Sequence, residues 1–408
     1  MQRDDIRAVG SLAGEASSVV TTLVCGMHAG IAGRVFDSIG PSAAPTRVVH
    51  DGLARVVYAG VGRGLRSAAR AVGAVAAEVW GDDRDDALDT RPGAAGAIAA
   101  VNGLYGDELA ERANRLAGAM QIRHAGEPVG LRPESLAATF PTATRRVVIF
   151  VHGWCLTERS WCRAPRDGDD TSPYGERLRE DLAFSPVYLR YNTGLHVSAN
   201  GRALADLLVQ LTANWPGGVD ELVLVGHSMG GLVARSACHY GGQQRHRWAD
   251  SVSHVVCLGS PHLGAALEKG VNMASWALAR LPETRAIARL VNTRSDGVKD
   301  LRFGACVEED WRDADPDEFL RDRCREVPFL PGAIYHFVAA TAAPPAVGLI
   351  AGDHVVRPKS ASGQGTSRRI PFDAAHGLTL TGLNHLDLLN HPAVYATLRQ
   401  WLAAPPAG

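Results

Sequence analysis

The pattern of apolar and polar positions changes near residue 118. Beyond it, short apolar runs alternate with longer stretches whose apolar residues recur at helical spacing. A hairpin around Gly126-Glu127-Pro128 is expected to open a sheet. We then expect strands near 147–151, 187–191, 221–225, 253–258, 334–340 and 377–382, and helices near 174–183, 199–214, 229–240 and 392–403. This alternation is typical of an α/β fold, in which helices cover both faces of a mostly parallel sheet.

The first 80 residues follow a different pattern. They predict two Gly/Ala-rich helices that break at Gly40-Pro41-Ser42. The second helix has apolar residues at helical spacing: Val49, Leu53, Val56, Val57, Val61, Leu65, Ala68, Val72, Val75 and Val79. We expect this helical extension, residues 1–80, to pack against the main domain or to dimerise with a second subunit. Peripheral contact with a membrane surface is the alternative.

The rest of the chain divides at two places. The charged run at 82–86 and the break at Arg91-Pro92-Gly93 predict a linker over 81–117, which leaves 118–403 for the α/β domain. The interval 262–331 does not continue the alternation of strands and helices, and it is long enough to be a cap inserted between two strands.

The composition of the chain argues against nucleic acid and zinc as binding partners. The formal net charge of −1 over 408 residues provides no basic face for nucleic acid. The seven cysteines include no CxxC or CxxH pair that would suggest zinc, and they fit a reducing compartment. In an exported protein, Cys155 with Cys162 or Cys306 with Cys324 would be the candidate pairs.

The amino end has acidic residues where a signal peptide has only bases, and no uninterrupted apolar run approaches the ~18 residues of a membrane span. We therefore expect a soluble, cytoplasmic protein, with peripheral membrane contact left open.

A Gly-x-Ser-x-Gly turn lies between an expected strand and an expected helix, at Gly226-His227-Ser228-Met229-Gly230. A serine at such a turn is held in a strained backbone conformation that points its hydroxyl out of the sheet, and side chains at Gly226 or Gly230 would crowd the turn. The start of the next helix favours developing negative charge. Ser228 is therefore a candidate nucleophile, against the alternative of an ordinary Gly-rich turn.

A serine hydroxyl needs a histidine to take its proton and a carboxylate to orient that histidine. The loop after the strand near 334–340 contains Asp353, which is our candidate acid, although an Asx-turn or a helix cap would also explain it. His385 follows the last strand and is our candidate base. His354, His376 and His391 are its rivals, but none of them lies just past that strand.

These motifs resemble those of α/β-hydrolases of the bacterial lipase and PGAP1-like esterase group. The resemblance covers about residues 119–403 and rests on His152-Gly153-Trp154, Gly226–Gly231, Gly259–Ala265, Gly352–Val356 and Asn384-His385-Leu386-Asp387. It implies a serine ester hydrolase that uses Ser228, Asp353 and His385 and forms an acyl-serine on small-molecule or lipid esters. A thioesterase or acyltransferase on the same triad is the enzymatic alternative. A membrane-associated scaffold that uses the amino-terminal helices is the non-enzymatic one.

The same resemblance implies an oxyanion hole made by the backbone amides of Trp154 and Met229. His152, Gly153, Gly226, His227 and Gly230 would support the elbow and its neighbouring loop, with His152 as a brace. No cofactor is expected, although Asp387 matches the position of a structural calcium ligand in several bacterial lipases.

The predicted cap supplies apolar residues, of which we expect most to form its own core and some to line a pocket for an apolar acyl chain. They are Trp276, Leu278, Leu281, Phe303, Trp311 and Phe319.

Overall fold

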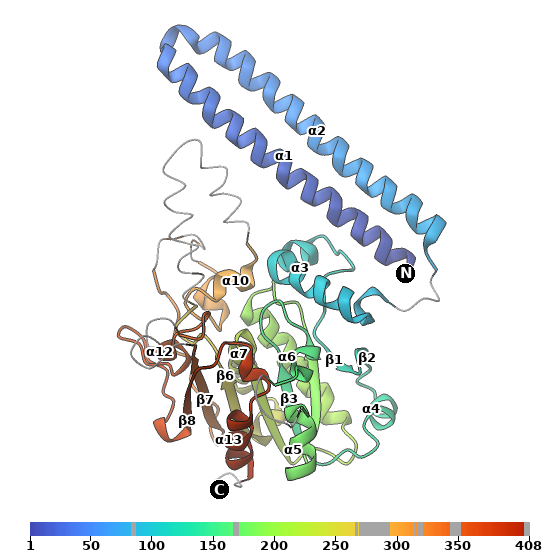
Figure 1. Cartoon of the computed structure of the whole chain (residues 1–408), viewed down its shortest axis with the longest axis vertical. Helices are drawn as coiled ribbons and strands as arrows, with labels where there is room; N and C mark the ends of the chain where they lie inside the picture. Colours follow the sequence, from blue (N-terminus) through green and yellow to red (C-terminus); the bar gives the residue numbers. More distant parts are fainter. Residues whose placement is uncertain are drawn as a thin grey trace.

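The computed structural model describes residues 1–82, 87–165, 171–265, 268, 294–313, 315, 318, 321–342 and 352–403. Its body is built on an eight-stranded sheet with the order β2-β1-β4-β3-β5-β6-β7-β8 (Figure 1). The strands are β1 (Gln121–His124), β2 (Glu127–Val129), β3 (Arg146–Val151), β4 (Ser185–Arg190), β5 (Glu221–His227), β6 (Val252–Leu258), β7 (Ile334–Thr341) and β8 (Gly377–Thr381). β1 and β2 form the expected hairpin, and β3 to β8 are parallel to one another.

Helices cover both faces of the sheet because the central strands are apolar on both sides. Residues of α6 (Val197–Asn214) and α7 (Met229–Gln243) complete the larger apolar core. Residues of α5 (Tyr174–Leu182) and α13 (Pro392–Ala403) complete the smaller core on the opposite face. The predicted α/β architecture is therefore confirmed.

The remaining described helices are short or lie near the amino end. They are α3 (Pro92–Glu111), α4 (Pro133–Thr139), α10 (Asp296–Asp300) and α12 (Pro358–Ala361), with 3-10 turns at Pro41–Ala43, Leu88–Thr90, Glu158–Cys162, Arg247–Ser251, Glu308–Asp310, Ala374–His376 and Asp387–Leu389.

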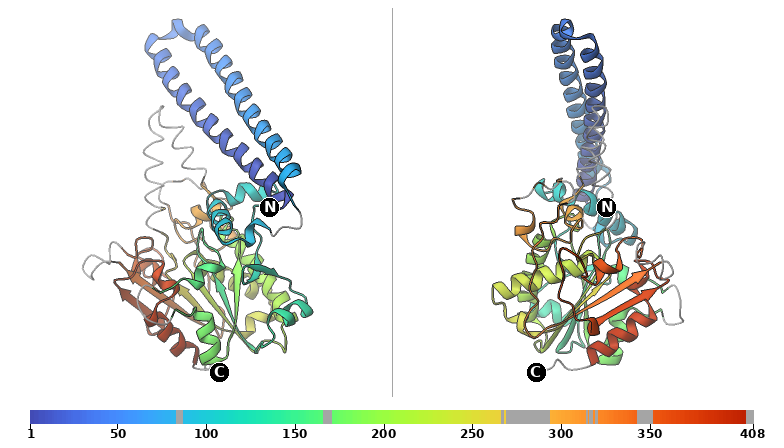
Figure 2. Two further views of the ribbon diagram at one scale, coloured as in Figure 1. Left: turned by 45° about the vertical axis from the view of Figure 1, so that its right-hand side comes forward. Right: turned by 90° about the vertical axis from the view of Figure 1, so that its left-hand side faces the viewer.

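The amino-terminal extension is a long antiparallel hairpin of α1 (Arg3–Ile39) and α2 (Ala44–Trp80), and it projects from the body (Figures 1 and 2). The two predicted helices are therefore present. Among the described residues, α1 is a helix long and apolar enough to cross a membrane by length and composition, and it is almost unburied. No uninterrupted apolar run marks this helix in the sequence, because polar Ser and Thr residues are scattered along it.

The stretch predicted as a linker needs a correction. Most of it forms α3, which packs against the body instead of connecting two parts freely. The predicted cap over 262–331 is described only in part. Its Trp276, Leu278, Leu281 and Phe319 lie outside the described residues. Trp311 stacks on His196 with ring centroids 3.7 Å apart, and its indole N–H donates to Ser198.

Candidate active site

Ser228 lies at the junction between β5 and α7. Its φ of 53° and ψ of −123° are unusual for a residue with a side chain. A Cβ on Gly226 would collide with the backbone of Gly230 and Gly231, and a Cβ on Gly230 would collide with the carbonyl of Val151. Glycine at both positions is therefore a steric requirement of this turn.

Asp353 and His385 form a buried pair. Nδ1 of His385 lies 2.6 Å from Oδ2 of Asp353, while Oδ1 accepts the amides of Val355 and Val356 at 3.0 and 2.7 Å. Burial alone would raise the pKa of the Asp353 carboxyl, but the hydrogen bonds from His385 and these amides outweigh burial and lower it. Asp353 therefore remains ionised at neutral pH and fixes the imidazole with Nδ1 protonated.

The loops bring His385 to the same rim of the sheet as Ser228. His227, next to Ser228, donates from Nε2 to the carbonyl of His385 at 3.0 Å, and their rings lie 4.7 Å apart. The amide of Ser228 donates to Leu258 at 2.8 Å, and a Cβ on the next residue, Gly259, would lie 3.2 Å from the His385 ring. The loops at the carboxyl ends of β5, β6 and β8 thus converge.

Nε2 of His385 is buried and has no hydrogen-bond partner among the described residues. The imidazole nitrogen that would accept the serine proton is therefore unoccupied by any other described group. Such hydrogen bonds commonly tighten only when substrate is bound.

The loop after β3 lies against the elbow. A Cβ on Gly153 would approach Cβ of Ser228 to 3.0 Å. The amides of Trp154 and Met229 donate to no residue within the described ranges. Both N–H groups are thus available to an added acceptor, as an oxyanion hole requires.

His152 and His227 are fully buried, and burial lowers their pKa values to about 4 and about 3. His152 contacts the carbonyl of Gly153 at 2.9 Å through Nδ1, and its ring stacks on Tyr191 at 4.4 Å. Both histidines are therefore neutral at pH 7, and their contacts suit bracing of the loop and the elbow.

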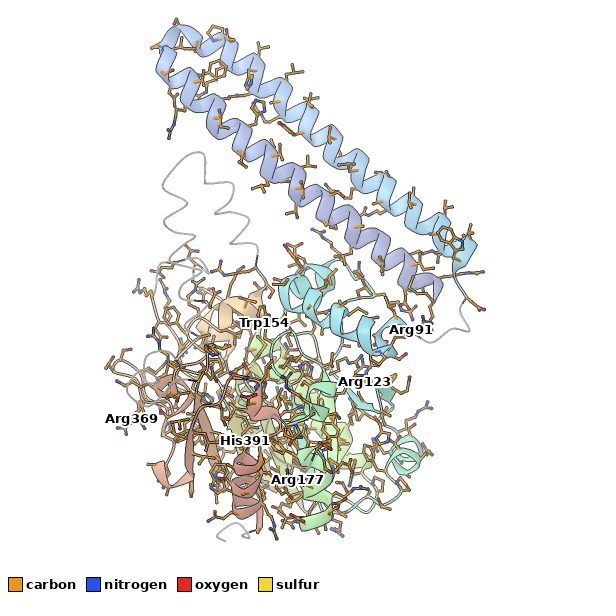
Figure 3. The ribbon with its side chains drawn as sticks, viewed as in Figure 1. Arg91, Arg123, Trp154, Arg177, Arg369 and His391 are labelled. Atoms are coloured by element: carbon orange, nitrogen blue, oxygen red, sulfur yellow. The ribbon has the colours of Figure 1, made fainter. Side chains whose placement is uncertain are left out.

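The rival histidines lie elsewhere. His354 is exposed beside Asp353, with a φ of 79°. His376 precedes β8 and packs near His336. His391 accepts the amide of Ala393 through Nδ1 at 3.2 Å, at the start of α13 (Figure 3). Only His385 among the four candidates contacts the carboxylate of Asp353 in the described structure.

Sequence reasoning missed the support of the Trp154 loop by α3. The Trp154 indole donates to the carbonyl of Gly103 at 2.8 Å, and a Cβ on Gly103 would collide with the Cys155 thiol. Thr193, beyond β4, accepts the Cys155 amide at 3.2 Å. The one available signal was the position of Thr193 just after an expected strand, since loops at that end of a parallel sheet form binding sites.

The carboxylate of Asp387, the possible calcium ligand, makes a contact within its own loop. Oδ2 of Asp387 accepts the amide of Asn384 at 2.9 Å within its own loop. No group of three or more His, Cys, Asp or Glu residues converges within the described part of the chain. All seven cysteines are free thiols.

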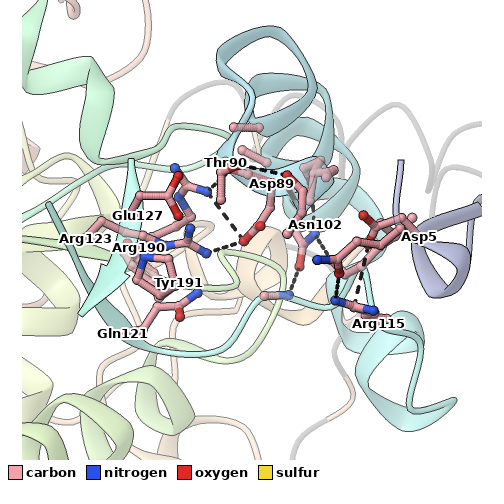
Figure 4. A pocket seen from close by; sticks show the side chains of 18 of the residues that line it. Asp5, Asp89, Thr90, Asn102, Arg115, Gln121, Arg123, Glu127, Arg190 and Tyr191 are labelled. Carbon is pink, nitrogen blue, oxygen red and sulfur yellow. Dashed lines mark hydrogen bonds and ion pairs between the residues drawn. The ribbon is translucent and has the colours of Figure 1, made fainter. Parts of the chain in front are cut away.

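A cavity of about 520 Å³ lies beside this region, between the start of α1, α3 and the β1–β4 edge (Figure 4). Its arginines are engaged in ion pairs: Arg123 with Asp89, and Arg190 with Glu158. Ser228, Asp353 and His385 are not among its lining residues, so it is separate from the candidate triad.

One protein family and several solved structures are similar to this chain. Residues 142–312 match the PGAP1-like alpha/beta domain family. Similar solved structures include the mature lipase BlEst2 of Bacillus licheniformis, with 18% identity, a TM-score of 0.42, and coverage of 63% of this chain and 91% of that one. A thermophilic esterase from Thermogutta terrifontis has 16% identity, a TM-score of 0.34, and coverage of 64% and 91%. RedJ, a thioesterase from the prodiginine pathway of Streptomyces coelicolor, has 19% identity, a TM-score of 0.33, and coverage of 64% and 87%.

No curated protein sequence matches the chain. The family match and the parallel sheet define an α/β-hydrolase. Over residues 142–312, the chain is similar to the PGAP1-like group of that superfamily.

Proposed function

We propose that this chain is a serine carboxylic-ester hydrolase that acts through an acyl-serine intermediate. The observation that carries the proposal is the buried Asp353–His385 pair, with Nε2 of His385 unpartnered at the rim that holds Ser228. No described feature favours a different catalytic group at this rim.

In the proposed mechanism, Nε2 of His385 takes the proton from Oγ of Ser228 as Oγ attacks the ester carbonyl. The amides of Trp154 and Met229 donate to the oxyanion, and Asp353 stabilises the charged imidazolium. His385 then protonates the leaving alcohol, which departs as the acyl-serine forms. Water, deprotonated by His385, attacks the acyl-serine, and the carboxylic acid is released with the Ser228 hydroxyl restored.

The test compares two serine variants. Ser228→Ala should abolish hydrolysis of p-nitrophenyl butyrate, since removal of such a nucleophile typically costs on the order of 10⁶-fold in kcat. Ser253→Ala is the matched control, because Ser253 lies at the opposite end of the sheet, where its hydroxyl bonds Glu221 at 2.9 Å. Near-normal turnover by Ser228→Ala would refute the proposal.

The thioesterase and acyltransferase alternatives use the same triad and differ in the acyl donor or acceptor. A substrate panel of simple esters, triglycerides and acyl-CoA, run on the wild type and on Ser228→Ala, separates them. Preferred turnover of acyl-CoA would favour thioester hydrolysis, and transfer to an added alcohol would favour acyl transfer.

A further inference from the structure

The amino-terminal hairpin uses polar and small residues where its two helices meet. Gly10 and Gly73 are in such close contact that a Cβ on Gly10 would lie 2.8 Å from Cα of Gly73. Arg70 pairs with Glu15 at 2.8 Å, and His28 contacts the Tyr58 hydroxyl at 3.1 Å. Little apolar surface is buried between the helices.

Most of the exposed large apolar residues of the hairpin fall into two rows. Neighbouring members of a row are three or four residues apart, except for a gap of seven between Leu65 and Val72, and they are 38% to 68% exposed. The α1 row is Val20, Val24, Met27, Ile31 and Val35, and the α2 row is Leu53, Val57, Val61, Leu65, Val72, Val75 and Val79.

Both rows lie on the same face of the hairpin. At 100° per residue, the α1 row is centred about a sixth of a turn from the positions that face α2, such as Gly10 and His28. The α2 row lies about a third of a turn from the positions that face α1, such as Tyr58 and Gly73. Because the helices are antiparallel, these rotations bring the two rows to one side. The hairpin therefore has one continuous apolar face.

The charge of the hairpin favours a lipid surface over a second copy of the chain as the partner that covers this face. Residues 15–71 of the hairpin contain six arginines against two aspartates and Glu15, a difference of three positive charges. The arginines are Arg34, Arg47, Arg55, Arg63, Arg66 and Arg70. Two such arms would repel each other face to face, whereas anionic lipid headgroups attract a basic, amphipathic helix pair.

The same arginines favour a hairpin that lies on the membrane over one that spans it. Arg66 of α2 donates to Ser18 of α1 at 2.8 Å, so Arg63 and Arg66 are level with the uncharged stretch 16–33 of α1. A spanning hairpin would place both guanidinium groups in hydrocarbon, where a charged side chain is strongly unfavourable. On a surface, their long side chains reach the headgroups.

We propose that the hairpin docks this protein on anionic phospholipid surfaces, with the two apolar rows immersed at the interface. The proposal does not depend on ester hydrolysis, because no residue of the candidate triad belongs to the hairpin.

The experiment measures co-sedimentation of the full chain with phosphatidylcholine vesicles, with and without phosphatidylglycerol. The wild type should bind the mixed vesicles and lose affinity as salt is raised. The double substitution Leu53→Gln and Val61→Gln should weaken binding by about tenfold or more, because each side chain gives up part of its burial in lipid.

The matched control is Val48→Gln with Val56→Gln, two residues of α2 that are 71% and 68% exposed but lie outside the row. It should bind vesicles as the wild type does. Equal losses in the two double variants would overturn the proposal. So would absence of vesicle binding together with a solution dimer that only the row variant dissociates, because a second copy would then occupy the face. Hydrolysis of a soluble ester by each variant reports separately on the fold and the triad.

Discussion

Asp353 makes two kinds of contact at once. One carboxylate oxygen accepts backbone amides of its own loop, as an Asx-turn would, and the other accepts from His385. One side chain therefore makes both the Asx-turn contacts and the contact to the candidate base. The loop holds the carboxylate through one oxygen, and the other oxygen orients the imidazole.

Replacing Asp353 by Asn should lower kcat for p-nitrophenyl butyrate by roughly 10³- to 10⁴-fold, because an amide that donates toward Nδ1 favours the wrong imidazole tautomer. Circular dichroism should show an intact fold. Asp387→Asn is the control, since this carboxylate contacts its own loop at Asn384. Equal losses in the two variants would mean that Asp353 is a loop-forming residue only.

Removal of calcium tests whether the loop that contains Asp387 binds this metal. Because Asp387 is engaged with the Asn384 amide, dialysis against EDTA should leave the activity and the melting temperature unchanged. Added calcium should restore nothing in the dialysed protein. A fall in melting temperature that calcium reverses would show that a calcium site exists.

At the scale of elements, α3 supports the loop that carries the candidate oxyanion amide. Gly103 lets the helix approach the loop, and its carbonyl holds the Trp154 indole. The sequence did not predict this helix, because 92–103 is rich in Gly and Ala and lacks an apolar face at helical spacing. The strands and the elbow were predictable because their signals are local runs and fixed spacings. Contacts such as Trp154 with Gly103, 51 residues apart, arise only from the fold.

Gly103→Ala should lower kcat by about tenfold or more, since its methyl group would push on Cys155 and displace the neighbouring Trp154 amide. Gly96→Ala on the same helix is the matched control, because a Cβ there would meet nothing within 4 Å. That variant should keep its activity and gain up to about 1 kcal/mol of stability. Unchanged kinetics in Gly103→Ala would show that α3 does not position the oxyanion amide.

At the scale of the whole molecule, several histidines are buried in their neutral form. Burial lowers the pKa values of His152, His227 and His336 to about 4, 3 and 3. In the unfolded chain they titrate near 6.5, so the unfolded state binds more protons below that pH. The stability of the folded protein is therefore not reduced by these histidines above about pH 6.5, and it falls as the pH decreases toward 4.

The free energy of unfolding, measured with urea at several pH values, should therefore decrease as the pH falls from 6.5 to 4. His336→Asn should reduce this slope by about 1.4 kcal/mol per pH unit, because one fewer proton is taken up on unfolding. His124→Asn, a substitution at an exposed histidine, is the control. An equal slope in wild type and His336→Asn would contradict the role assigned to burial.

The central claim is that Ser228 is the residue that becomes acylated. The most direct measurement is mass spectrometry of the intact protein and its peptides after reaction with a fluorophosphonate. The account predicts a single adduct on the peptide that contains Ser228, and no adduct in Ser228→Ala. An adduct on another residue, or equal labelling of Ser228→Ala, would contradict it.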